Sequence, residues 1–163
     1  MNAKTAAKKG SRPIRHITTC HIDNDISGEA YESLVRLLCE HATTCQLVSH
    51  GKPTVQTCRD ALLRLAELGD VTAEVSEWHG TRLYRATATL HSFKVSHKAL
   101  LFLLTHGKSL FSWQWPDLPE DLCFLAADGT PLLFSTAHEE YAQLTIPENM
   151  HVSDALKAVL EKS

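Results

Sequence analysis

The chain has 163 residues, of which 44% are hydrophobic and 21% are charged, and its formal net charge is −3 at pH 7. This length suits one domain with its own apolar core, and the composition excludes the disordered and membrane-protein extremes. The weak charge argues against nucleic-acid binding by the folded part of the chain, and no apolar stretch approaches the roughly 20 residues of a membrane span.

The first 13 residues contain Lys4, Lys8, Lys9 and Arg12 and show no apolar period. Such a composition cannot offset the entropy lost on ordering, so we expect a flexible basic arm over 1–13 and a single domain over 14–163. No apolar signal core follows the arm, which predicts a cytoplasmic protein. The lysines leave open a contact with nucleic acid, although solubilising tails of this kind are commoner.

The first half of the domain predicts alternating strands and helices. An extended segment covers 14–22, and a helix follows Ser27 as N-cap. The β-rich segment 43–48 precedes a second helix that opens at Thr54 and stops at Gly69.

A hairpin is predicted next, from strands at 71–77 and 83–90 around Trp78-His79-Gly80. Within the second of these strands, Tyr84, Ala86, Ala88 and Leu90 alternate with polar residues and form the predicted buried face. A third helix begins after Ser96 and stops at His106-Gly107.

The remaining chain begins with an aromatic segment and a proline-stiffened loop over 110–121. Strands at 122–126 and 130–136 flank Asp128-Gly129, which is a strong two-residue hairpin signal. A further strand at 141–146 and a short helix at 153–161 complete the chain. The fold class is therefore α+β, a single domain of antiparallel hairpins packed with about four helices.

Two local patterns resemble ligand sites but lack the spacing that these sites need. Gly107-Lys108-Ser109 has no second glycine five positions earlier, so it is a helix stop and not a phosphate-binding loop. Cys39 and His41 are two residues apart on a helix and point away from each other, which disfavours a zinc site with Cys45 and His50. The five cysteines are expected to be free thiols, and we expect no metal or cofactor.

The loop after the third helix combines large aromatic rings with carboxylates. Aromatic anchors on a preordered loop suit a protein-protein interface, because little side-chain entropy is lost on binding. A second acidic pair follows the last hairpin. The predicted partner-binding residues are Trp113, Trp115, Asp117, Glu120, Asp121, Glu139 and Glu140. The alternative for the aromatic residues is that at least one tryptophan packs in the core.

A catalytic alternative uses His138 as a base with Glu139 or Glu140, in a small hydrolase or transferase. The chain contains no HExxH, GxSxG or dinucleotide-binding motif. A Ser-His-Asp combination can be written down for almost any chain with ten histidines, so the sequence alone does not support one. These observations favour a protein that is not an enzyme.

Four segments form a recognisable pattern: 76–81, 110–124, Asp128-Gly129 and Ala137-His138-Glu139. Together they resemble a widespread, uncharacterised family of small bacterial proteins whose members in spore formers often carry a stage III sporulation label. The resemblance covers roughly 14–146. His79 departs from the family pattern, which has proline there. The resemblance implies a compact α+β domain and no particular reaction.

The leading interpretation is an immunity protein that binds a cognate bacterial toxin and blocks it. Single-domain acidic proteins without active-site motifs are often of this kind, and a rigid acidic surface can occlude a basic substrate cleft.

Overall fold

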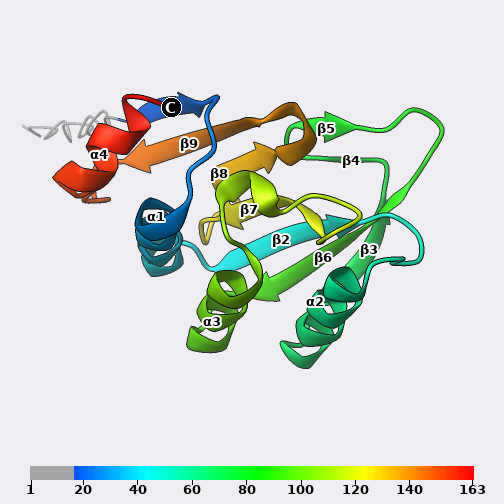
Figure 1. Cartoon of the computed structure of the whole chain (residues 1–163). Coiled ribbons are helices and arrows are strands. Elements are labelled where there is room, and N and C mark those ends of the chain that lie inside the picture. Colours follow the sequence, from blue (N-terminus) through cyan, green and yellow to red (C-terminus); the bar gives the residue numbers. More distant parts are fainter. Residues whose placement is uncertain (1–16) are drawn as a thin grey trace, which may run out of the picture.

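The computed structural model describes residues 17–163 as a two-layer α+β domain. A seven-stranded sheet has helices α1, α2 and α3 on one face, and a small β4–β5 hairpin lies on the other (Figure 1). In chain order the elements are β1 (Ile17–Ile22), α1 (Gly28–His41), β2 (Thr44–Ser49), α2 (Gln56–Glu67), β3 (Val71–Val75), β4 (Glu77–Trp78), β5 (Thr81–Arg82), β6 (Ala88–Lys94), α3 (His97–His106), η1 (Leu110–Ser112), β7 (Glu120–Leu125), β8 (Pro131–Thr136), η2 (Ala137–Glu139), β9 (Tyr141–Pro147) and α4 (Asp154–Leu160).

The sheet has the order β1-β9-β8-β7-β2-β6-β3, and every neighbouring pair of strands is antiparallel. The predicted α+β class with antiparallel hairpins and four helices is therefore confirmed. The first strand pairs with the last, and β2 lies between strands that are 40 or more residues later in the chain. Most of the sheet is thus built from pairings between distant segments.

Helices α1 and α3 begin where the local capping signals predict. Ser27 is the N-cap of α1, and the Ser96 hydroxyl accepts a hydrogen bond of 3.1 Å from the Ala99 amide at the start of α3. Helix α2 begins at Gln56, two residues after the predicted Thr54. Gly69 follows it with a φ of 74°, a left-handed conformation that ends helices and that glycine adopts without strain.

The core lies between the sheet and the three helices. Leu34 and Leu38 of α1 face the sheet and pack with Leu47, Phe93 and other buried apolar side chains. Each fully buried leucine or phenylalanine contributes about 1.5–3 kcal/mol relative to an exposed one. Helix α4 adds two buried leucines and packs beside α1.

The predicted hairpin over 71–77 and 83–90 is wrong in its second strand. Strand β6 begins at Ala88, and the segment 83–87 lies outside the strands, with Tyr84 81% exposed. The alternation of apolar and polar residues before Ala88 therefore does not mark a buried face. The hairpin at Asp128-Gly129 and the strand that follows it are confirmed as β7, β8 and β9.

The predicted arm over 1–13 and residues 14–16 lie outside the described residues. Within 17–163, no helix has the length and apolar character that crossing a membrane requires.

Candidate functional site

The Asp121 carboxylate ties together three segments that are far apart in the sequence. Its Oδ2 accepts hydrogen bonds from Trp78 Nε1 at 2.8 Å and from the Thr81 hydroxyl at 3.3 Å. Its Oδ1 accepts a third from the Ala137 amide at 2.9 Å. The β4–β5 hairpin, the start of β7 and the segment after β8 therefore meet at one buried side chain.

A left-handed backbone brings two consecutive carboxylates to the same place. Successive strand residues normally point to opposite faces, but Asp121 has a φ of 60°, and the pairing of β2 with β7 shifts register between Gln46 and Val48. As a result Glu120 and Asp121 both offer a carboxylate oxygen within 4.8 Å of a ring nitrogen of His138. Aspartate adopts this backbone conformation more readily than most residues.

Glu120 is fixed from two sides. Its Oε1 lies 2.6 Å from His50 Nε2, and its Oε2 accepts a hydrogen bond of 3.4 Å from the Trp115 amide. The His50 ring in turn packs between Trp78 and Trp115, with ring centroids 5.9 Å away in both cases. The four residues His50, Glu120, Asp121 and His138 are called the β7 cluster below.

The two carboxylates of the β7 cluster are buried and form no ion pair with a lysine or arginine of the described residues. Glu120 is 7% exposed and Asp121 is 2% exposed. Burial raises the pKa of Asp121 above its usual range, the hydrogen bonds from Trp78 and Ala137 oppose this, and the neighbouring Glu120 charge adds to it. Within 17–163, the ion pair of Glu120 is with His50, and no lysine or arginine forms an ion pair with either carboxylate.

The predicted partner-binding residues separate into a buried and a surface group. Trp113 is fully buried, and its Nε1 donates a 2.8 Å hydrogen bond to the Tyr31 hydroxyl. Trp113 thus packs in the core, which was the alternative for at least one tryptophan. Glu120 and Asp121 are also buried, so these three residues have little surface for a partner to contact. Trp115 is partly buried, and the exposed acidic members of the set are Asp117, Glu139 and Glu140.

The catalytic alternative does not assemble as a hydrogen-bonded pair. His138 Nε2 and Glu139 Oε1 are 3.9 Å apart, which exceeds hydrogen-bond distance, and the two side chains are 45% and 66% exposed. A ring nitrogen of His138 instead lies within 4.8 Å of a carboxylate oxygen of both Glu120 and Asp121, which are buried. The cysteines and histidines around β2 also separate, because Cys45 is in the core while His50 is bonded to Glu120.

A second polar arrangement joins Ser49, His91 and Asp70. The Ser49 hydroxyl lies 2.8 Å from His91 Nε2, and His91 Nδ1 lies 2.6 Å from Asp70 Oδ2. This is the order of a serine-hydrolase relay. However, Ser49 is 5% exposed and His91 is 8% exposed, and His91 pairs in register with the core residue Leu47. A substrate cannot reach the hydroxyl, so the three residues form a buried hydrogen-bonded network.

Sequence reasoning missed this network because its members come from three separate segments of the chain. Ser49 ends β2, His91 lies in β6, and Asp70 precedes β3. They meet because β6 lies between β2 and β3 in the sheet. No spacing rule links positions 49, 70 and 91, so only the strand order identifies them.

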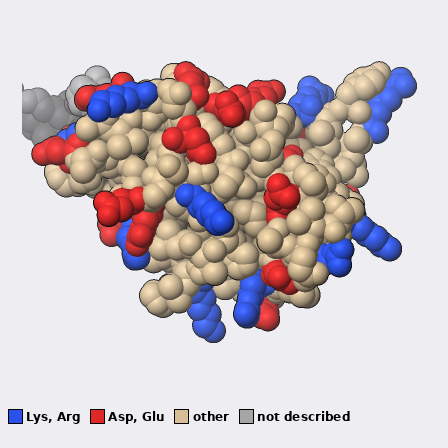
Figure 2. Space-filling model, viewed as in Figure 1, with Lys and Arg blue, Asp and Glu red and all other residues tan. Residues whose placement is uncertain are grey.

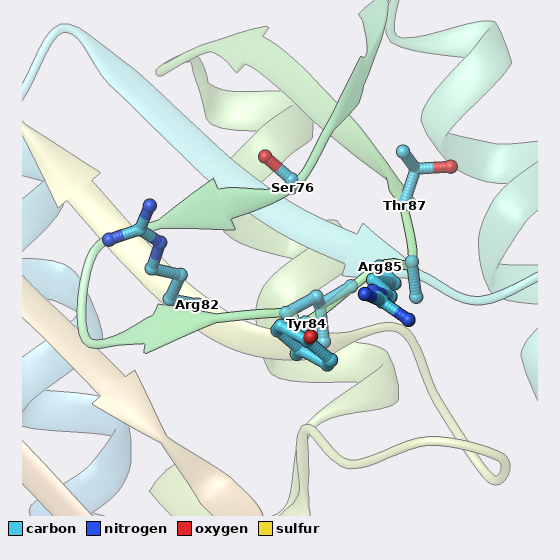
Figure 3. A pocket seen from close by; sticks show the side chains of 7 residues that line it. Ser76, Arg82, Tyr84, Arg85 and Thr87 are labelled. Carbon is cyan, nitrogen blue, oxygen red and sulfur yellow. The ribbon is translucent and has the colours of Figure 1, made fainter.

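The chain between β5 and β6, residues 83–87, projects from the sheet as a loop, in which Tyr84 is exposed. In Figure 2 it is the projection at the upper right, with basic side chains on it. A hollow beside this loop is lined by seven residues of the segment 76–87, among them Arg82, Tyr84 and Arg85. Figure 3 shows the Tyr84 ring beside Arg85, whose guanidinium carbon lies 5.0 Å from the ring centroid. This hollow is open and lies apart from the β7 cluster.

Fold and site together define a two-layer α+β domain with a buried carboxylate cluster at the start of the central strand, β7. No known family model matches the chain, and neither the curated proteins nor the solved structures contain a significant match.

Proposed function

We propose that this protein acts by binding another protein, as an immunity protein that neutralises a toxin. The observation that carries the proposal is a set of exposed carboxylates whose backbone segments are hydrogen-bonded to the buried β7 cluster. Asp117, Glu139 and Glu140 are exposed, and Trp115, two residues before Asp117, is partly buried. We call these four residues the acidic edge.

The acidic edge is ordered by hydrogen bonds on both of its segments. The Trp115 amide donates to Glu120, and the Asp117 carbonyl accepts a 2.8 Å hydrogen bond from the Thr57 hydroxyl of α2. On the other segment the Ala137 amide donates to Asp121, and the Glu140 amide donates to the Ala137 carbonyl at 3.1 Å. Both segments are thus attached to Glu120-Asp121. A surface ordered before binding loses less entropy in a complex.

The charge of the acidic edge suggests the chemistry of the partner. Three exposed carboxylates on a chain of net charge −3 attract a basic surface and accelerate encounter with it. A toxin that acts on an anionic substrate presents a basic cleft, and occlusion of that cleft explains protection without catalysis. The family resemblance, which supplies a fold and no reaction, is compatible with this role.

Charge reversal tests the proposal. The gene next to this one supplies the candidate toxin, and a pull-down from the native cell identifies the partner if that candidate does not bind. A triple variant with Asp117, Glu139 and Glu140 each changed to Lys should abolish protection on co-expression and weaken binding at least about tenfold. All three side chains are exposed, so the fold should persist.

The matched control changes three other exposed acidic residues to lysine: Glu29, Glu148 and Glu161. This variant has the same net charge as the first but keeps the acidic edge. It should protect as well as the wild type. Full protection by the Asp117/Glu139/Glu140 variant would remove the acidic edge from the interface.

A further inference from the structure

The buried carboxylates of the β7 cluster have a charge that the described protein does not balance with a lysine or arginine. Glu120 and Asp121 are adjacent in sequence and nearly inaccessible to water. Their nearest basic partners are imidazoles, His50 at 2.6 Å from Glu120 and His138 across the cluster. Two neighbouring buried carboxylates repel each other unless a proton or a cation lies between them.

The geometry points to a cation, and we propose that Glu120, Asp121 and His138 bind a divalent transition-metal ion, with Zn²⁺ as the best match. One ligand atom from each of the three residues lies within 4.8 Å of the other two. Three such atoms share a point at most about 2.8 Å from each, and small side-chain rotations reach the roughly 2.0–2.2 Å bonds of zinc to nitrogen and oxygen.

Each ligand retains a lone pair for the ion. A carboxylate has about four acceptor positions. Asp121 uses two of these on Oδ2 and one on Oδ1, and Glu120 uses one on each oxygen. These hydrogen bonds orient the carboxylates as outer-shell partners orient metal ligands. His138 contributes a ring nitrogen when neutral, and its partly exposed side chain gives the ion a route from solvent.

The ligand set selects the class of metal. An imidazole with two carboxylates suits Zn²⁺ and similar ions, whereas Mg²⁺ and Ca²⁺ prefer oxygen ligands alone. Three protein ligands leave at least one coordination position for water or for a group of a partner. Binding of the ion by the isolated chain does not depend on the proposed immunity role.

Metal titration of the full chain tests the proposal. The protein is dialysed against EDTA and then titrated with Zn²⁺ by calorimetry and with Co²⁺ by visible absorption. We expect one equivalent to bind. His138→Ala should weaken the affinity by about 10- to 100-fold or more, because it removes a ligand and not merely an outer-shell partner. The same metal should raise the Tm of the wild type by more than that of the variant, because the gain falls as the Kd rises.

His151→Ala is the matched control, because His151 is also exposed and lies outside the β7 cluster. It should bind the metal as the wild type does. Binding weaker than about 0.1 mM by the wild type would overturn the proposal. Equal binding by His138→Ala, or a Co²⁺-thiolate absorption band that assigns the ion to a cysteine, would also overturn it.

Discussion

Asp121→Asn is the most informative single change, because it keeps the shape of the side chain while it removes the charge and replaces one acceptor oxygen by an NH₂ donor. The carboxylate accepts from Trp78 and Thr81 on one oxygen and from Ala137 on the other. Asparagine has one carbonyl oxygen and one NH₂ group. Its NH₂ group, itself a donor, must therefore lie against one of the groups that donate to the Asp121 carboxylate. Asparagine also tolerates the left-handed backbone at this position, so backbone strain should not change.

The magnitude follows from the buried donor that loses its acceptor. An unsatisfied buried N–H costs about 1–3 kcal/mol. Part of this lost free energy is recovered, because the substitution also removes a buried carboxylate whose desolvation raises the pKa of Asp121. We therefore expect a net loss of about 1–2 kcal/mol in the free energy of unfolding. In a domain of this size, 1 kcal/mol corresponds to about 2–4 °C in Tm.

Urea unfolding followed by circular dichroism measures this loss, and Trp78→Phe provides a second arm. Phenylalanine removes the indole donor, so the two changes should be non-additive in a double-mutant cycle, with a coupling of about 1 kcal/mol or more. Asp117→Asn is the control, since Asp117 is exposed, and should stay within about 0.5 kcal/mol. A fully stable Asp121→Asn protein, or strict additivity with Trp78→Phe, would refute the idea that Asp121 holds the three segments together.

Three further predictions concern other buried groups and pH. Ser49→Ala leaves the ring nitrogen of His91 without its partner and should cost about 1–3 kcal/mol in urea unfolding, while esterase activity should be absent from both proteins. Gly107→Ala places a Cβ against Trp113 Nε1 and the Tyr31 hydroxyl, so overpacking should lower stability by about 1–3 kcal/mol. The pKa of Asp121 in the folded state is raised above 3.8, so the folded state binds this proton more tightly than the unfolded state does. Protonation of Asp121 therefore stabilises the fold. This contribution is complete below pH 3.8 and is lost as pH rises through the folded pKa. The stability of the wild type relative to Asp121→Asn should therefore increase as pH falls toward 3.8, and a difference that is flat with pH would contradict this assignment.

The sequence by itself determined the elements whose signals are local. Ser27 and Ser96 mark helix starts, Gly69 marks a helix end, and Asp128-Gly129 marks the hairpin between β7 and β8. These signals work because a cap or a tight turn is decided by a few neighbouring residues and their own hydrogen bonds. The α+β class followed from the same local patterns.

Only the tertiary structure decided which residues meet. Trp113 and Trp115 are two positions apart and have similar sequence surroundings, yet one is in the core and the other reaches the acidic edge. The convergence of Trp78, Asp121 and Ala137 depends on where the β4–β5 hairpin folds over the sheet. Likewise the Ser49-His91-Asp70 network exists because β6 lies between β2 and β3. Contacts of this kind depend on strand order and on burial, which arise from pairing between distant segments and leave no spacing in the sequence.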